Sequence, residues 1–214
     1  MIGANAGQRH DAISLHAGGA MGAVFNINQH PEVRMFFNPN QAALVLIDIQ
    51  EKLAPTISEK ETIIRHAGLL ADCATVLGIP ILVTEQYPAG LGPTVPAIME
   101  KARNARRIEK STFSCCRTPA FIQALDATGR RQIILAGIET HVCVFQTAAD
   151  LVRLKYRVQV VADAVSSRTE SNRAIGLDRI SRSGADVTSC ESVIFELLET
   201  SNRPEFKQIH KLLK

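Results

Sequence analysis

Apolar residues follow two alternating patterns from about residue 42 to the end of the chain. The stretch 43–47 is an unbroken apolar run, which is typical of a strand covered on both faces. The next apolar residues recur at helical spacing, at Ile63, Ala67, Leu70, Ala74 and Leu77. Residues 58–61 match a capping box at the start of this helix, and Gly78 and Pro80 predict its end.

The change from strand pattern to helix pattern repeats along the rest of the chain. Further strands are predicted at 81–83, 107–109, 132–136, 158–161 and 187–188, and further helices at 118–125, 143–154, 171–183, 193–198 and 204–213. This alternation predicts an α/β fold, with three layers (α/β/α) around a mainly parallel, Rossmann-like sheet of about six strands. Right-handed crossovers would place the strand ends at one edge, where ligands of open α/β sheets bind.

Three side chains with catalytic potential fall at predicted strand ends. Asp48 follows the first apolar run, Lys110 follows residues 107–109, and Cys143 follows the turn after residues 132–136. If these strands are neighbours, the three side chains form a base, a charge stabiliser and a nucleophile. The residues alone also allow a helix-capping aspartate, a solvated lysine and a buried structural cysteine.

Cys143 lies where a helical pattern begins. A helix N-terminus carries about half a positive charge and open backbone donors. These features favour a thiolate, so the sequence predicts a lowered pKa for the Cys143 thiol. Cys73, inside a helical pattern, and Cys190, near a short strand, are interpreted as structural.

Composition fits one enzyme-sized domain at residues 41–214, preceded by an N-terminal extension at residues 1–40. The 214 residues are 46% hydrophobic and 21% charged, and no apolar run is long enough to predict a membrane span.

A net charge of +3 with scattered basic residues argues against a nucleic-acid partner, and the cluster at 103–107 is interpreted as a solvated face. Five cysteines without small-domain spacing predict free thiols and a cytoplasmic location. The extension leaves a mitochondrial location as the alternative.

Several segments together resemble one family. They are Leu46-Ile47-Asp48-Ile49-Gln50, Val83-Thr84-Glu85-Gln86-Tyr87-Pro88, Gly90-Leu91-Gly92-Pro93-Thr94-Val95-Pro96, Lys110-Ser111-Thr112-Phe113-Ser114 and the turn from Gly137 to Cys143. In this order and spacing they resemble the isochorismatase-like cysteine hydrolases, and within them the isochorismatase domain-containing proteins. The resemblance runs from about Ala42 to the C-terminus.

The resemblance implies a mechanism as well as a fold. It implies that Asp48 takes the proton of Cys143, that Lys110 stabilises the charged pair, and that a small amide-like substrate forms a thioester on Cys143. It also implies a cis peptide bond at Ile138–Glu139 and a homo-oligomer, a dimer or larger. The turn residues Glu139, Thr140 and Val142 are expected near the oxyanion, where backbone donors contribute about 3 kcal/mol each.

The substrate pocket and the metal content are narrower expectations. The expected pocket residues are Gln50, Gln86, Tyr87, Phe113 and His141, although Glu139 and His141 have turn stabilisation as an equal alternative. Related nicotinamidases bind a metal through an Asp-x-His pair and a further histidine, and this sequence contains no Asp-x-His or His-x-His pair. The absence of these pairs predicts a site without a metal, and the resemblance implies hydrolysis of C–N bonds without another cofactor.

Two other functional classes fit parts of the sequence. A redox-sensitive or interaction protein would use the same fold and a reactive thiol without hydrolysis. A nucleotide-dependent oxidoreductase fits the fold class, but Gly90-Leu91-Gly92-Pro93 lacks the third glycine of a dinucleotide site and the Lys-Ser/Thr of a P-loop. We interpret that segment as a rigid loop.

Overall fold

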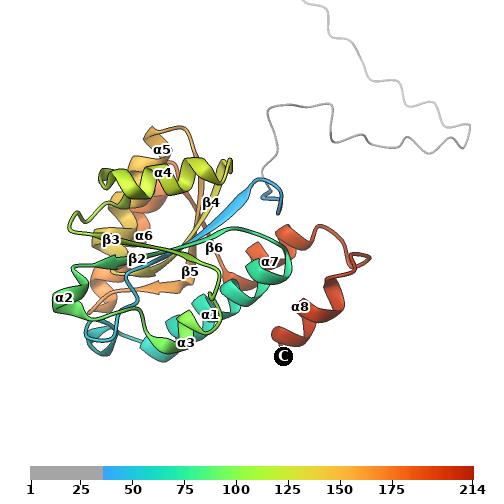
Figure 1. Ribbon diagram of the computed structural model, residues 1–214, viewed down its shortest axis with the longest axis horizontal. Coiled ribbons are helices and arrows are strands. Elements are labelled where there is room, and N and C mark those ends of the chain that lie inside the picture. Colours follow the sequence, from blue (N-terminus) through green and yellow to red (C-terminus); the bar gives the residue numbers. More distant parts are fainter. Residues whose placement is uncertain (1–35) are drawn as a thin grey trace, which may run out of the picture. The chain divides into compact units, whose positions relative to one another are not determined.

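The computed structural model describes residues 36–214, so most of the expected N-terminal extension lies outside the described residues. The strands are β1 (Ala42–Ile47), β2 (Ile81–Gln86), β3 (Arg106–Lys110), β4 (Gln132–Ile138), β5 (Arg157–Ser166) and β6 (Asp186–Thr188). The helices are α1 (Lys60–Val76), α2 (Pro88–Leu91), α3 (Pro96–Met99), α4 (Pro119–Ala127), α5 (Phe145–Arg153), α6 (Glu170–Arg182), α7 (Cys190–Leu198) and α8 (Phe206–Leu212). Figure 1 shows strands and helices alternating around one sheet.

The six strands form one parallel sheet in the order β3-β2-β1-β4-β5-β6. The first strand, β1, therefore lies in the middle of the sheet. Strands β2 and β3 follow on one side of it, and β4, β5 and β6 follow on the other. The predicted fold class is confirmed. The order also makes β1 and β4 neighbours, so the residues that follow these two strands meet at the carboxyl edge.

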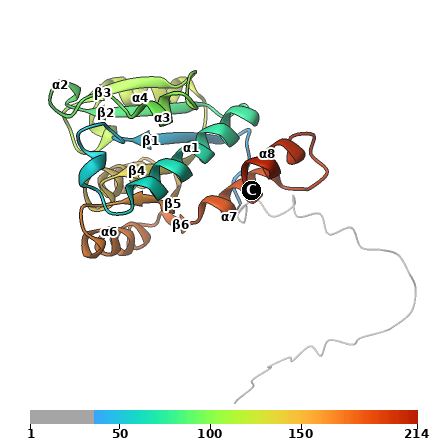
Figure 2. The same ribbon diagram turned by 90° about the horizontal axis from the view of Figure 1, so that it is seen from below.

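Each face of the sheet carries its own apolar cluster because strand side chains alternate between faces. On one face Leu44 and Leu46 of β1 pack with residues of α1, α3, α7 and α8. On the other face Ala43, Val45 and Ile47 pack with residues of α4, α5 and α6. Figure 1 shows these two helical layers on opposite sides of the sheet, and Figure 2 shows the molecule from below, with α1 lying across the sheet. No helix within residues 36–214 is long and apolar enough to cross a membrane.

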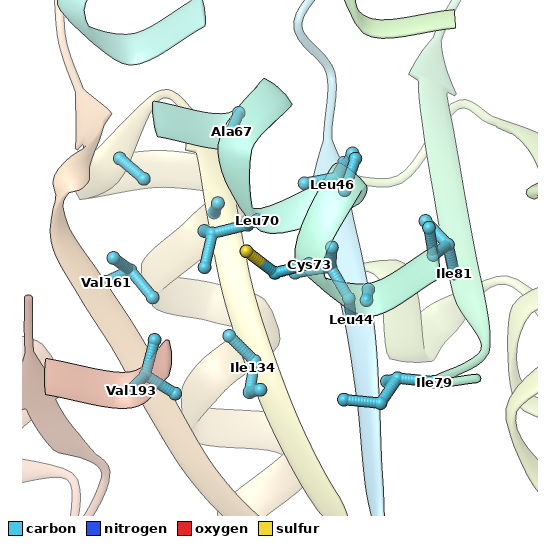
Figure 3. Packing of buried hydrophobic residues seen from close by; sticks show 14 of the residues in the cluster. Leu44, Leu46, Ala67, Leu70, Cys73, Ile79, Ile81, Ile134, Val161 and Val193 are labelled. Carbon is cyan, nitrogen blue, oxygen red and sulfur yellow. The ribbon is translucent and has the colours of Figure 1, made fainter. Parts of the chain in front are cut away.

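Cys73 and Cys190 lie inside the first of these clusters. Figure 3 shows Cys73 on α1 surrounded by aliphatic side chains of the sheet and of neighbouring helices. Cys73 is 1% exposed and Cys190 is 2% exposed. Burial and the charge of Asp72 raise the pKa of Cys73 to about 12, as expected of an inert packing residue. Both positions agree with the structural interpretation.

The predicted capping box at the start of α1 is wrong. The helix begins at Lys60, and the residue before it, Glu59, has a left-handed conformation with φ 54° and makes no side-chain cap. Ser58 is held elsewhere, because its N–H donates to the Ser167 carbonyl and its hydroxyl to the Arg168 carbonyl. A contact with a segment more than one hundred residues away thus replaces the local cap.

The C-terminal helices bury most of their apolar residues within the chain itself. Ile194, Leu197, Leu198 and Ile209 are at most 3% exposed and belong to the cluster on the α1 face. Phe195 and Leu212 remain 41% and 39% exposed. Core packing therefore accounts for most of this apolar surface.

Gly137, the residue before the last one of β4, lies where the backbone of β1 leaves no room for a side chain. Its φ is +132°, and a Cβ placed on it would lie 2.1 Å from the carbonyl oxygen of Ile47. Ile47 directly precedes Asp48. Only glycine fits this position, where a side chain would separate the two central strands.

We expect Gly137→Ala to prevent folding or to lower the free energy of unfolding by more than about 4 kcal/mol, since it combines backbone strain with a clash against a strand. Urea denaturation of the purified protein measures the change. Gly78→Ala is the matched control, because Gly78 also has a positive φ (+65°) but has open space around its Cα. It should cost about 1 kcal/mol, and equal losses for the two variants would contradict the steric explanation.

Candidate active site

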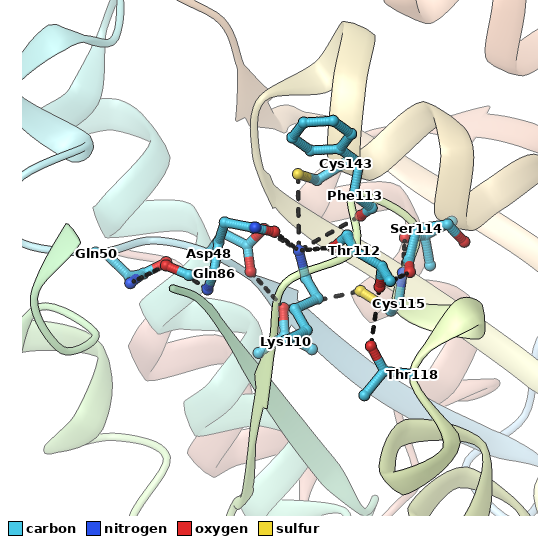
Figure 4. Close-up of polar contacts among 12 residues, drawn as sticks. Asp48, Gln50, Gln86, Lys110, Thr112, Phe113, Ser114, Cys115, Thr118 and Cys143 are labelled. Atoms are coloured by element: carbon cyan, nitrogen blue, oxygen red, sulfur yellow. Dashed lines mark hydrogen bonds and ion pairs between the residues drawn. The ribbon is translucent and has the colours of Figure 1, made fainter. Parts of the chain in front are cut away.

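The carboxyl edge of the sheet gathers the predicted reactive residues from four neighbouring strands. Asp48 follows β1, Thr84 lies in β2, Lys110 is the last residue of β3, and Cys143 lies in the turn after β4. Figure 4 shows the Lys110 side chain lying between Asp48 and Cys143. The expected meeting of Asp48, Lys110 and Cys143 is therefore what the fold produces.

A buried ion pair forms the centre of this group. The Lys110 ammonium donates to Asp48 Oδ2 at 2.6 Å, and both side chains are 0% exposed. Lys110 also donates to the Gln86 side-chain oxygen at 2.8 Å, and lies 3.7 Å from the Cys143 sulfur. Burial is the largest single influence and lowers the pKa of Lys110, but the negative charge and hydrogen bond of Asp48, together with the influence of the Cys115 and Cys143 thiols, outweigh it and the pKa is raised. Lys110 therefore stays a cation at neutral pH.

Cys143 is carried by a π-helical turn, Thr140–Val144, and α5 begins only after it, at Phe145. The thiol-bearing residue is 7% exposed. The sequence predicted Cys143 at the first turn of an ordinary helix, where open N–H groups would face the sulfur. The structure instead places it in a wider turn, with the side chain facing the buried ion pair.

The predicted lowering of the Cys143 pKa is wrong. Burial raises the pKa of the thiol, the negative charge of Asp48 raises it further, and Lys110 offsets only part of the increase. The physical reason is that a thiolate here would be desolvated and would face a carboxylate. The resting thiol is neutral and becomes nucleophilic by giving up its proton.

Thr84 is a polar residue at the site that sequence reasoning missed. Its hydroxyl donates to Asp48 Oδ1 at 2.7 Å, and its carbonyl oxygen accepts the Asp48 N–H at 3.1 Å. These two bonds hold Asp48, whose φ of 54° is left-handed. The available signal was a threonine at a position of β2 where the alternation calls for an apolar residue, since Thr84 is 0% exposed.

Gln50 and Gln86 were expected to line an open pocket, but their side chains are hydrogen-bonded within the protein. Gln50 is 0% exposed, and its amide nitrogen donates to the carbonyl oxygens of Gln86 and Gly92 while its side-chain oxygen accepts the Gln86 N–H. The Gln86 amide bridges Lys110 and the Ser111 carbonyl. Gln50 therefore fixes the loop after β2, and Gln86 fixes Lys110.

Tyr87 and Phe113 are the exposed aromatic residues of this edge. They are 63% and 55% exposed; Tyr87 directly follows β2, and Phe113 lies three residues after Lys110, the last residue of β3. Figure 4 shows the Phe113 ring on the side of the site where the Cys143 sulfur lies. Of the segment 90–93, interpreted from sequence as a rigid loop, the first two residues belong to a single helical turn, α2, and Gly92 follows it.

The turn that carries Cys143 is anchored by its neighbours. The cis peptide bond expected at Ile138–Glu139 is present. Glu139 accepts hydrogen bonds from the N–H and guanidinium of Arg168, and His141 Nδ1 lies 2.9 Å from the Ser167 hydroxyl oxygen. These contacts give Glu139 and His141 turn-stabilising positions.

The remaining turn residues differ in what their polar atoms contact. The Val142 N–H donates to the Glu139 carbonyl oxygen at 3.1 Å, so it is already engaged and does not match the expected oxyanion donor. Thr140 is 0% exposed, and its hydroxyl has no hydrogen-bond partner among the described residues. Within residues 36–214 there is no cluster of three or more His, Cys, Asp or Glu side chains arranged to hold a metal ion.

Comparison with known proteins shows the class to which this fold and site belong. The family model described as the isochorismatase domain matches residues 42–192. The mouse isochorismatase domain-containing protein 2A is 41% identical over 177 residues, covering 82% of this chain and 84% of that protein. The chain therefore belongs to the isochorismatase family, a class of hydrolases.

Solved structures agree with this assignment. A structure described as the MAR1 ribonuclease of Caenorhabditis elegans is 41% identical, with a TM-score of 0.80 over 83% of this chain and 92% of that one. YcaC is similar in two structures, each with a TM-score of 0.80 over 85% of this chain and 91% of the other. YcaC from Pseudomonas aeruginosa (26% identical) carries covalent acrylamide, and YcaC from Escherichia coli (27% identical) is described as an octameric hydrolase of unknown specificity.

The electrostatics of the site predict an unusual response of Cys143 to Asp48→Asn. Removing the carboxylate charge leaves the Lys110 ammonium facing the thiol, so the alkylation midpoint should fall by at least about one pH unit. Iodoacetamide labelling at pH 7.5, followed by intact mass spectrometry, should become about tenfold faster. Lys110→Met should slow labelling instead. A thermal melt of each variant controls for folding, and slower labelling of folded Asp48→Asn would contradict this electrostatic account.

Proposed function

We propose that the protein hydrolyses a small amide-like molecule through a covalent thioester on Cys143. The observation that carries this proposal is the position of the Lys110 ammonium, which contacts the Asp48 carboxylate at 2.6 Å and the Cys143 sulfur at 3.7 Å. A nucleophile, a base and a fixed positive charge thus meet in one buried site. A thiol made reactive by an adjacent base is a general solution for acyl transfer.

The first half of the reaction forms the thioester. Asp48 takes the proton of Cys143 as the sulfur attacks the carbonyl carbon, so that negative charge moves from Asp48 toward the substrate oxygen. Lys110 faces both the starting and the final position of this charge and stabilises it throughout. When the tetrahedral intermediate collapses, the C–N bond breaks and the amine leaves with the proton that Asp48 holds.

The second half returns the enzyme to its starting state. Asp48 takes a proton from water, the resulting hydroxide attacks the thioester carbon, and the C–S bond breaks. The carboxylic acid leaves, and the sulfur recovers the proton from Asp48. The same carboxylate therefore acts as base and acid in both halves.

The turn Thr140–Val144 supports an oxyanion site beside the sulfur. Backbone N–H groups directed at a developing oxyanion contribute about 3 kcal/mol each. Because the Val142 N–H is bonded to Glu139, we assign this role to the other N–H groups between Thr140 and Cys143. The engaged Val142 N–H then serves to hold the turn in shape.

We further propose that the reaction needs no metal. The two carboxylate oxygens of Asp48 already accept hydrogen bonds, Oδ1 from Thr84 and Oδ2 from Lys110. The positive charge that a metal would supply to a carbonyl oxygen is supplied here by Lys110 and by backbone dipoles. Treatment with EDTA should leave turnover unchanged, and a loss restored by added zinc would contradict this assignment.

We also propose a homo-oligomer in the cytoplasm. The octameric state of the E. coli YcaC supports assembly, and five free thiols, of which four are buried, support a reducing compartment. The domain proposed to assemble is the sheet with its helices, from about residue 41 to the C-terminus. Sedimentation velocity at micromolar concentration should give at least twice the mass of one chain, and a monomer would contradict the proposal.

A mass-spectrometric trap tests the proposed function. We expect a panel of small amides to leave an acyl group on Cys143 of the wild type and none on Asp48→Asn, since the amine cannot leave without the proton from Asp48. Cys116→Ser is the matched control, because Cys116 is a partly exposed thiol near the site and should be dispensable. The wild type and Cys116→Ser should also release the carboxylic acid, and Asp48→Asn should not.

Two results would contradict the proposal. Acid release that survives in Cys143→Ser would show that the sulfur is not the nucleophile. A Cys143 that iodoacetamide labels, with no amide or ester ever turned over, would favour the redox-sensitive or interaction protein. RNA belongs in the same panel because of the C. elegans ribonuclease, and RNA cleavage independent of Cys143 would indicate a different reaction.

A further inference from the structure

We propose that Thr84 is a positioning residue that holds the Asp48 carboxylate in place as a hydrogen-bond acceptor and so sets how readily Cys143 gives up its proton. The inference rests on the proposed role of Asp48 as the base. It adds a fourth member to the group formed by Asp48, Lys110 and Cys143.

Thr84 contacts Asp48 at a single oxygen with well-defined geometry. Its hydroxyl donates to Oδ1 at 2.7 Å, while Lys110 occupies Oδ2 at 2.6 Å. Thr84 comes from β2 and Lys110 from β3, so two different strands fix the two oxygens. Asp48 therefore cannot turn its carboxylate without breaking one of these bonds.

A second thiol, that of Cys115, donates to the Thr84 hydroxyl oxygen and so sets the direction in which the hydroxyl hydrogen points. Cys115 is 0% exposed, and its sulfur donates to the Thr84 hydroxyl oxygen at 3.8 Å. Burial and the Asp48 charge raise the pKa of Cys115 to about 11, so it keeps its proton at neutral pH. Because Thr84 accepts from Cys115, its own hydrogen is directed to Asp48. The result is a chain from the Cys115 thiol through the Thr84 hydroxyl to Oδ1.

A hydroxyl is not needed at this position for packing. In the sheet register Thr84 lies beside Ile47 and Ile108, and both belong to the apolar cluster on that face. Valine has the same branched shape and suits a strand. A buried hydroxyl is costly unless it is hydrogen-bonded, so the oxygen of Thr84 is explained by its bond to Asp48.

The charged and titratable groups around Asp48 are few and lie on different elements. Lys110 faces it from β3, Cys143 from the π-helical turn, and Cys115 from the turn after β3. The adjacent Glu85 turns to the other face of β2, where it accepts from the Thr94 N–H and hydroxyl. Removing the Thr84 hydroxyl therefore changes one contact of the carboxylate and leaves the surrounding charges in place.

Thr84→Val tests the proposal through the pH dependence of Cys143 alkylation by iodoacetamide. Without its donor, Asp48 holds a proton more readily, so the state with a protonated Asp48 and a Cys143 thiolate becomes more populated. We expect the rate near pH 7.5 to rise about tenfold and the acidic limb of the profile to move up by about one pH unit, because a hydrogen bond to a charged group is worth at least that factor. Thr84→Ser keeps the hydroxyl and should restore the wild-type profile.

An unchanged Thr84→Val profile, or a rate lowered equally at every pH, would overturn the proposal, because loosened packing alone gives no shift of the limb. Thr84→Ala replaces Thr84→Val if the latter fails to fold by thermal melt. If Asp48→Asn also leaves the profile unchanged, the assignment of Asp48 as base fails. If Asp48→Asn abolishes the limb and folded Thr84→Val does not move it, only the role of Thr84 fails.

Discussion

The buried contact between Lys110 and Asp48 is the interaction on which the rest of the site depends. Two fully buried charges are tolerable only when they are close to each other and when further hydrogen bonds satisfy their remaining atoms. Gln86 and the carbonyl oxygens of Thr112 and Phe113 meet this requirement for Lys110, and Thr84 meets it for Asp48. Many of the polar groups at the carboxyl edge of the sheet are thus hydrogen-bonded to this one buried ion pair.

The sheet supplies the rigidity that the ion pair needs. Asp48, Thr84, Lys110 and Cys143 belong to four adjacent strands or to the turns that follow them, and the strand order fixes their spacing. Gly137 allows β4 to approach β1 directly beside Asp48, which brings the turn that carries Cys143 within reach. Side chains on rigid strands keep catalytic geometry better than side chains on free loops.

The sequence predicts the fold and the three central residues because both follow from local patterns and short motifs. Apolar runs and helical spacing located most of the strands, and Asp48 directly follows one such run. Lys110 and Cys143 were found through the short motifs around them, at the end of a mixed segment and in the turn after a strand. The partners of polar side chains were not predictable in the same way. Ser58 was expected to cap its own helix, yet it binds residues 167 and 168, and Gln50 was expected in a pocket, yet it clamps the loop after β2. Thr84 lies 36 positions from the carboxylate that it binds, and no local pattern records such a contact. The direction of the Cys143 pKa shift was missed for the same reason, since it depends on burial and on Asp48.

The neutral state of the resting thiol has a consequence for the chemical durability of the protein. Peroxide and other cellular oxidants attack thiolates, and cysteines that sense oxidation are exposed and have a low pKa. Cys143 has the opposite character, because burial and the adjacent carboxylate keep it protonated. A thiol held in this form is protected from sulfenic and sulfinic acid formation. The same charge arrangement that suppresses the thiolate therefore also slows the oxidative loss of this cysteine.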